Sequence, residues 1–144
     1  MISRVLLGYD GSLAAIDACN FAVDLARRYR AELHILSVAR PPEFGTEVET
    51  EELIEQGERH CARLLKPLQA RLGEGDPKTT FEIVVGHPAE QILLCAERRH
   101  ADHIVVGRRG HTLFARWLLG SVARQVIAHA ACAVTVVRAK DPHA

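Results

Sequence analysis

The chain has 144 residues, of which 48% are hydrophobic and 25% are charged, a composition that excludes a disordered or fibrous protein and suits a single folded domain over residues 1–144. Its 18 basic residues balance its 18 acidic residues, so no overall field would draw it to nucleic acid or to an anionic membrane. The apolar run near the amino terminus, Val5 to Leu7, is too short for a signal peptide, and no run approaches the ~20 apolar residues of a membrane span. We therefore expect a cytoplasmic protein without membrane insertion or nucleic-acid binding.

The first part of the chain predicts a strand, a helix and a second strand. Arg4–Tyr9 is a short apolar run that leads into a helix capped by Ser12. Small apolar residues recur at spacings of three and four from Ala15 to Ala26, so the inner face of this helix is flat enough to lie close to a sheet. Glu32–Val38 predicts the second strand. Pro41-Pro42 then requires a loop, because proline removes backbone donors.

A long helix is predicted after this loop. Residues 43–52 carry five glutamates and no basic residue, which suits the positive end of a helix and is most simply a solvated face. An apolar stripe at helical spacing follows, made of Leu53, Gly57, Cys61, Leu64, Leu65, Leu68 and Leu72.

The second half repeats the alternation of strand and helix. Thr79–Val85 predicts a strand, and Pro88 opens a helix at its first position. Ala101–Val106 predicts the fourth strand and Ala133–Val137 the last. The helix between them should face the core with the side that carries Val122, Val126, Ile127 and Ala130.

The predicted order is βαβαβαβαβ. Short, uniformly apolar strands that alternate with helices indicate a parallel sheet with right-handed crossovers. We therefore predict the α/β class, as a single open parallel five-stranded sheet sandwiched by helices in a Rossmann-like arrangement.

Glycines after the fourth predicted strand indicate an anion site. Gly107 and Gly110 are three residues apart, and Gly120-Ser121 follows at a predicted helix start. Glycine lets the backbone approach a bulky anion, and a helix amino terminus offers free amide groups to a phosphate. Arg108 and Arg109 either neutralise phosphates or face water.

A ligand in an open parallel sheet binds beyond the carboxyl ends of the strands, where the strand order reverses. Asp10, Val38 and Gly107 end three predicted strands and therefore face the same edge of the sheet. The Asp10 carboxylate can accept hydrogen bonds from both hydroxyls of a ribose. The pattern describes a nucleotide that spans the first and fourth strand ends.

Cysteines and histidines give no metal signal. Cys19, Cys61, Cys95 and Cys132 form no Cys-x-x-Cys pair, and we expect buried core thiols. His100 and His103 are three residues apart with no third ligand nearby in the sequence. We expect no metal site made of side chains.

The arrangement resembles the universal stress protein family, in particular its nucleotide-binding branch. That branch carries G-x2-G-x9-G-[ST], matched by Gly107, Gly110, Gly120 and Ser121, and the opening VLLGYDGS and closing AVTVV are also similar. The resemblance covers nearly the whole chain.

The resemblance implies a role for each matched residue. It implies that Asp10 and Gly107 hold the ribose and that the backbone of Val38 reads the adenine. It places the phosphates among Gly110, Gly120, Ser121 and Val122. The full predicted binding set is Gly8, Tyr9, Asp10, Val38, Val106, Gly107, Gly110, Gly120, Ser121 and Val122. Tyr9 stands where smaller residues are common in the family, so it either stacks on the base or crowds it. The implied ligand is ATP, or ADP or AMP, with Mg²⁺ or Mn²⁺ held through the phosphates.

Three functions remain open. The first is an ATP-binding regulatory protein of the stress response, in which the nucleotide changes conformation or assembly and an unknown partner protein reads the change. The second is a slow ATP hydrolase or phosphotransferase, although no GxxxxGK[ST] loop is present. The third is a dimeric scaffold that binds no nucleotide. The apolar last strand and the resemblance both point to a homodimer or a higher oligomer.

Overall fold

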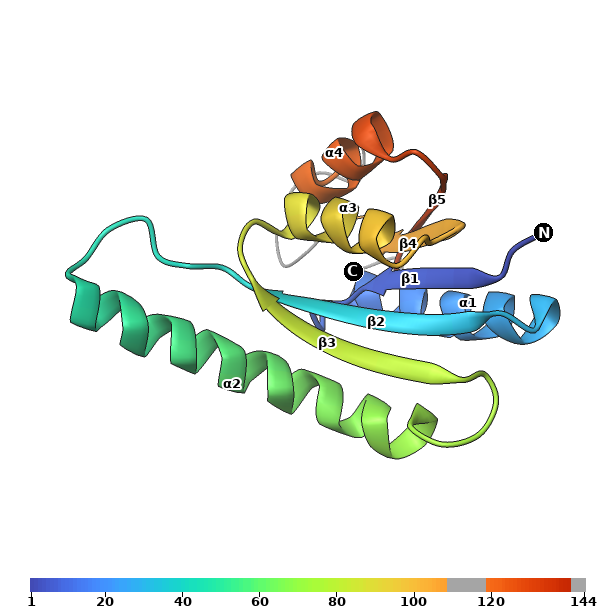
Figure 1. Cartoon of the computed structure of the whole chain (residues 1–144), viewed down its shortest axis with the longest axis horizontal. Helices are drawn as coiled ribbons and strands as arrows, with labels where there is room; N and C mark the ends of the chain where they lie inside the picture. The colour runs from blue at the N-terminus through green and yellow to red at the C-terminus, as the bar shows by residue number, and fades with distance from the viewer. Residues whose placement is uncertain (109–118, 141–144) are drawn as a thin grey trace.

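The computed structural model describes residues 1–108 and 119–140 (Figure 1). Its elements confirm the predicted alternation of strand and helix. In chain order they are β1 (Arg4–Gly8), α1 (Leu13–Tyr29), β2 (Glu32–Ala39), α2 (Glu47–Leu72), β3 (Thr79–Val85), α3 (Pro88–Arg98), β4 (His103–Gly107), α4 (Ser121–His129) and β5 (Ala133–Val137).

The strands form one parallel sheet in the order β3-β2-β1-β4-β5. The central strand is β1, in which Val5 is aligned with Leu33 of β2 on one side and with His103 of β4 on the other. The chain therefore builds outward from β1 to β3 and then returns to the other side of β1 for β4. The strand order reverses between β1 and β4, which is where open parallel sheets bind ligands.

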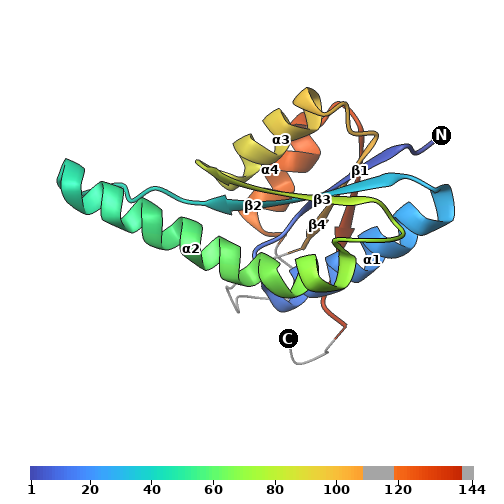
Figure 2. The same ribbon diagram turned by 60° about the horizontal axis from the view of Figure 1, so that its bottom comes forward.

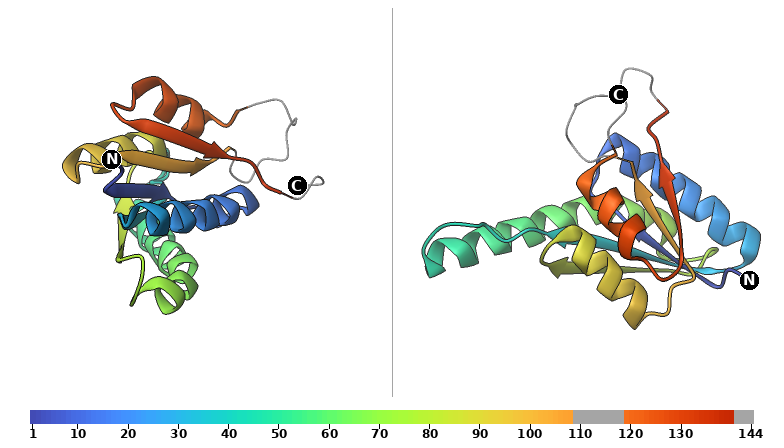
Figure 3. Two further views of the ribbon diagram at one scale, coloured as in Figure 1. Left: turned by 90° about the vertical axis from the view of Figure 1, so that its right-hand side faces the viewer. Right: turned by 90° about the horizontal axis from the view of Figure 1, so that it is seen from above.

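Helices cover both faces of the sheet, as predicted (Figures 2 and 3). Alternate residues of β1 enter separate cores, because successive strand side chains point to opposite faces. Val5 and Leu7 belong to the core against α1 and α2, and Leu6 belongs to the core against α3 and α4. These three residues of β1 are each at most 1% exposed. The predicted class of fold is thus confirmed.

The start of α1 follows from its first residues. The hydroxyl of Ser12 accepts a hydrogen bond from the backbone N–H of Ala15 at 3.1 Å, which is the predicted cap. Ala18, Ala22 and Ala26 are fully buried, so the flat inner face lies against the sheet. The close approach of α1 positions the β1–α1 turn beside the end of β4.

The long helix α2 corrects one prediction. A capping box between Thr46 and Glu49 begins it, but its first half projects beyond the sheet (Figure 1). Leu53, predicted to face the core, is 45% exposed, and the buried stripe begins only at Cys61. At Gly57 the helix passes Ala39, the last residue of β2, so the residues before Gly57 extend beyond the sheet.

The last helix also differs in one position. Val126 is fully buried as predicted, whereas Ile127 is 50% exposed. The helix α4 covers an edge of the sheet and buries only a narrow side, with Ala123 and Val126 as its buried residues. None of the helices in the described chain combines the length and apolarity that a membrane-spanning helix needs.

Candidate functional site

A cavity of about 400 Å³ lies at the carboxyl ends of the strands, where the strand order reverses between β1 and β4. Its walls come from the β1–α1 turn, the end of β2, the start of α3, the end of β4 and the first turn of α4. Small-molecule sites typically have volumes of ~300–1000 Å³. The cavity is therefore large enough for a small ligand.

Nine of the predicted binding residues line this single cavity. They are Gly8, Tyr9, Asp10, Val38, Val106, Gly107, Gly120, Ser121 and Val122. Gly110 lies outside the described residues, as does Arg109, while Arg108 lines the cavity. The structure thus brings together residues that are more than a hundred positions apart in the sequence.

The turn after β1 holds the Asp10 carboxylate at the mouth of the cavity. Its Oδ1 accepts a hydrogen bond from the backbone N–H of Ser12 at 2.9 Å, and Asp10 is exposed. Gly11, between them, has a φ of 78°, a left-handed conformation that favours glycine. Because an ionised carboxylate accepts several hydrogen bonds at once, this anchoring is compatible with accepting hydroxyl donors from a ligand.

Gly107 has a packing role that the sequence did not reveal. A Cβ at this position would lie 3.0 Å from both the carbonyl carbon and the Cβ of Ala14 in α1. A Cβ at Gly8 would lie 2.8 Å from Cδ1 of Ile92 in α3. These two glycines therefore allow α1 and α3 to approach the strand ends and form the walls of the cavity.

The amino terminus of α4 forms another part of the cavity wall. Gly120 is its N-cap and supplies no side-chain cap, and Ser121, Val122 and Ala123 of the first turn line the cavity. The backbone N–H of Gly120 donates to the carbonyl of Arg108 at 2.9 Å, which ties this end to the residue after β4. A helix amino terminus attracts anions through its amide groups and its dipole.

The Tyr9 side chain lies on the opposite face of the sheet from most of the residues that line the cavity. It packs against the core beneath α1 and α2, and its backbone N–H donates to the carbonyl of Leu36 at 2.9 Å. Burial and the neighbouring Cys19 raise the pKa of the Tyr9 phenol. These contacts make Tyr9 a structural neighbour of the site, and its packing favours neither the stacking nor the crowding considered from the sequence.

Besides Arg108, seven wall residues were not predicted as binding residues: Ser12, Ala15, Leu36, Arg40, Pro88, Ile92 and Ala123. Arg40 is exposed at the end of β2, and Pro88 and Ile92 come from the start of α3. Arg40 follows the last residue of β2, so the rule that ligands bind beyond strand ends could have identified it. Nothing in the local pattern of α3 could have shown that Ile92 reaches Gly8, because that contact depends on how α3 crosses the sheet.

The wall of the cavity carries both negative and positive side chains. Asp10 supplies a carboxylate, and Arg40 and Arg108 supply guanidinium groups. The cations and the α4 amino terminus suit an anionic group, while the carboxylate suits hydroxyl donors. A ligand that has both an anionic end and a hydroxyl-bearing part would satisfy all of these groups.

The sequence matches the family model described as the universal stress protein family over residues 1–138. A universal stress protein of Methanocaldococcus jannaschii is 33% identical over 145 residues, covering 96% of this chain and 83% of that protein.

Solved structures agree with this match. The universal stress protein UspA of Lactobacillus plantarum superposes with a TM-score of 0.85 at 29% identity, covering 95% of this chain and 98% of that one. A universal stress protein solved in complex with cAMP superposes with a TM-score of 0.65 at 25% identity, covering 96% and 99%. The similarity extends over the strands and helices that form the cavity.

Proposed function

Because this chain belongs to the universal stress protein family, and because one cavity joins a carboxylate, two cations and a helix amino terminus, we propose that it binds an adenine nucleotide and acts as a regulatory protein. The observation that carries this proposal is the meeting of Asp10 with the first turn of α4 around one cavity. A similar protein solved with cAMP supports an adenine nucleotide as the class of ligand.

The residues present fit such a ligand in their chemistry. Asp10 would accept hydrogen bonds from the ribose hydroxyls beside Gly107, and the backbone of Val38 would recognise the base. The amide groups at Gly120 and Ser121 would hold phosphates. We propose ATP, or ADP or AMP, with Mg²⁺ or Mn²⁺ bound through the phosphates.

The cations of the wall would stabilise the same phosphates. Arg108 follows Gly107, and its backbone carbonyl accepts a hydrogen bond from the N–H of Gly120. The Arg108 side chain therefore begins close to the amino terminus of α4. Arginine forms charge-assisted hydrogen bonds to phosphate. Arg40 approaches from the end of β2.

A regulatory role fits the wall better than rapid catalysis. Among the described lining residues, Asp10 is the carboxylate, and neither lysine nor histidine is present. Rapid phosphoryl transfer uses a positioned base together with cations and metal around the γ-phosphate. We therefore propose slow hydrolysis at most, with a partner protein reading the nucleotide state.

Assembly is part of the proposal. The strand β5 is at an edge of the sheet, and exposed edges of apolar strands readily pair with another chain. We propose a homodimer through β5, higher assembly of such dimers, and a change in assembly or loop conformation when the nucleotide binds.

Two measurements on the purified full chain test this function. Nucleotide released by denaturing the protein, identified by absorbance and mass, is expected for a nucleotide-binding protein, and a dimeric scaffold would release none. ATP turnover is expected to be far below about one per second, the lower range for typical enzymes. Sustained turnover at or above that rate would contradict the regulatory role and favour the hydrolase or phosphotransferase.

A further inference from the structure

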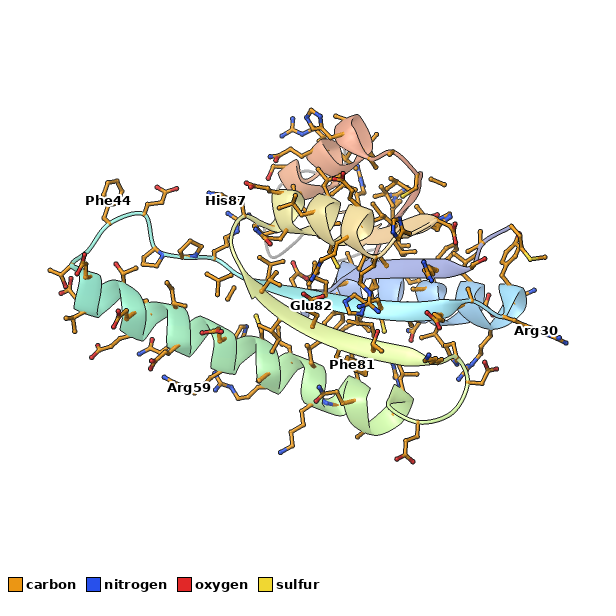
Figure 4. All side chains as sticks on the ribbon, viewed as in Figure 1. Arg30, Phe44, Arg59, Phe81, Glu82 and His87 are labelled. Carbon is orange, nitrogen blue, oxygen red and sulfur yellow. The ribbon has the colours of Figure 1, made fainter. Side chains whose placement is uncertain are left out.

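A second group of polar side chains lies between the sheet and α3, away from the nucleotide cavity. His34 of β2, Glu82 of β3 and Cys95 of α3 each offer one ligand atom, and these atoms all lie within 4.8 Å of one another. Figure 4 shows Glu82 on the side of β3 opposite to Phe81. The residues meet because β2 and β3 pair in register, with His34 aligned to Thr80. Sequence reasoning predicted Cys95 only as a core thiol and did not single out His34 or Glu82.

Two members of the group are buried, and the side chain of the third, Glu82, is 23% exposed. Cys95 is 1% exposed and His34 is 7% exposed. Nε2 of His34 lies 2.8 Å from Oε1 of Glu82, and Sγ of Cys95 lies 3.8 Å from the same oxygen. An imidazole, a carboxylate and a thiol that meet around one point offer the nitrogen, oxygen and sulfur ligands that zinc takes.

The spacing fits a tetrahedral ion after small movements. Zn²⁺ binds nitrogen, oxygen and sulfur ligands at about 2.0–2.3 Å, so its ligand atoms lie roughly 3.5 Å apart. The Cys95–Glu82 distance of 3.8 Å is already close to this value, and the His34–Glu82 distance of 2.8 Å must open by less than an ångström. The mixture of imidazole, thiolate and carboxylate favours zinc over magnesium or calcium, which prefer oxygen ligands alone.

A supporting residue already holds the imidazole. Nδ1 of His34 lies 2.6 Å from the hydroxyl of Thr80, which also accepts a hydrogen bond from Nη2 of Arg99 at 3.3 Å. Without an ion, Nε2 must carry the proton, because the Glu82 carboxylate only accepts. With an ion, the proton moves to Nδ1 and is donated to Thr80, an arrangement typical of metal-bound histidines.

Charge also balances when an ion replaces an arginine. Nη2 of Arg98 now donates to both oxygens of Glu82 at 3.0 and 2.8 Å, yet the Arg98 side chain is 57% exposed. A zinc ion with one thiolate and one carboxylate has no net charge, so Arg98 can turn into water. The loss is modest, since partly exposed ion pairs contribute little.

A second cavity lies beside the histidine of the group. This cavity has a volume of about 370 Å³ and is lined by His34, Thr80 and Arg98, among others. Of the three proposed ligands, His34 lines this cavity, whereas Glu82 and Cys95 are not among its lining residues.

We propose that His34, Glu82 and Cys95 form a zinc-binding site with water in the fourth position. The Cys95 thiol releases its proton on binding, and Arg98 leaves Glu82. This proposal is independent of the nucleotide site, because none of its three residues lines the nucleotide cavity.

The test uses the purified full chain, stripped of metal and titrated with Zn²⁺ by calorimetry and with Co²⁺ by absorbance. One ion per chain is expected, with a thiolate-to-cobalt charge-transfer band in the near ultraviolet. The variants Cys95→Ser and His34→Gln should weaken zinc binding at least about tenfold, and Cys95→Ser should abolish the band. Circular dichroism establishes that each variant is folded.

Matched controls are available on other parts of the fold. Cys61→Ser removes a buried thiol from α2, a helix whose Leu65 and Leu68 pack on the other face of the sheet. His103→Gln removes a strand histidine whose Nε2 lies 2.6 Å from a threonine hydroxyl, that of Thr135. Both controls should keep the cobalt band and the zinc affinity.

A substitution of the largely exposed Arg98 makes the test independent of folding defects. Arg98→Ala removes the cation that competes for Glu82, so it should bind zinc more tightly than the natural protein. No zinc binding at micromolar concentration, or unchanged binding in Cys95→Ser, would overturn the proposal. Weaker binding in Arg98→Ala would also overturn it, because the cluster would then depend on its arginine for structure.

Discussion

Gly107, at the end of β4, lies directly against Ala14 of α1: a Cβ on the glycine would be 3.0 Å from the carbonyl carbon of Ala14. This approach brings the β1–α1 turn, which carries Asp10, to the same edge as the amino terminus of α4. The architecture of the cavity therefore depends on a packing contact as well as on the groups that would touch a ligand.

Replacing Gly107 should lower stability even without a nucleotide. Gly107→Ala forces a methyl group against Ala14, and overpacking of this kind typically costs about 1–3 kcal/mol. Urea unfolding of the nucleotide-free protein measures the change. Ser121→Ala, at an exposed position of α4, should change the free energy of unfolding by less than about 0.5 kcal/mol. A Gly107→Ala protein as stable as the natural one would show that α1 moves away at no cost.

Asp10→Asn should weaken nucleotide binding while leaving the fold intact. The amide oxygen can still accept the Ser12 N–H, so the turn is preserved. The lost charge on the acceptor weakens hydrogen bonds to ribose hydroxyls, and we expect a dissociation constant for ATP raised roughly tenfold or more. Calorimetry measures the affinity, and thermal unfolding checks the fold. Unchanged affinity would place the ribose elsewhere.

Arg108→Gln should discriminate between nucleotides by their phosphates. If the guanidinium contacts the terminal phosphates, the variant loses affinity for ATP by about tenfold and loses much less for AMP. At raised salt, the loss of ATP affinity and the loss of AMP affinity in the variant should become more alike, since salt screens exposed charges. An equal loss for ATP and AMP would contradict a contact with the terminal phosphates, and no loss would leave Arg108 facing water.

Asp102 makes the stability of the protein depend on pH. Its Oδ2 accepts the backbone N–H groups of Ser3 and Arg4 at 2.6 and 2.7 Å, and these bonds hold the pKa of the carboxyl below its ordinary value. The folded form therefore favours the ionised group. Its stabilisation is complete above the unfolded pKa of about 3.9 and is lost as the pH falls from there through the folded pKa.

The variant Asp102→Asn tests this dependence. The free energy of unfolding of the natural protein, measured by urea between about pH 5 and pH 3, should fall more steeply than that of the variant. The two curves should converge at the acid end. Parallel curves over this range would show that Asp102 keeps the same pKa in the folded and unfolded chain.

Local sequence signals were sufficient for the elements and the edge that carries the site. Ser12 and Pro88 begin their helices as predicted, and Asp10 and Gly107 meet at one cavity because parallel strands bring their carboxyl ends together. The glycine pattern did not reveal that Gly107 is needed for packing against α1.

Long-range packing set the limit of prediction. The stripe that includes Leu53 indicates which side of α2 is apolar, but it cannot show that the sheet ends before that residue. Likewise, His34, Glu82 and Cys95 come together only through the register of β2 with β3 and the crossing of α3. No spacing in the sequence encodes those contacts.

Calorimetric titration of the purified full chain with ATP and Mg²⁺ tests most directly whether the cavity between β1 and β4 is a nucleotide site. We predict saturable heat that corresponds to one nucleotide per chain and is strongly reduced in Asp10→Asn. A folded protein that gives no heat with ATP, ADP or AMP, and that carries no nucleotide from the cell, would contradict the account.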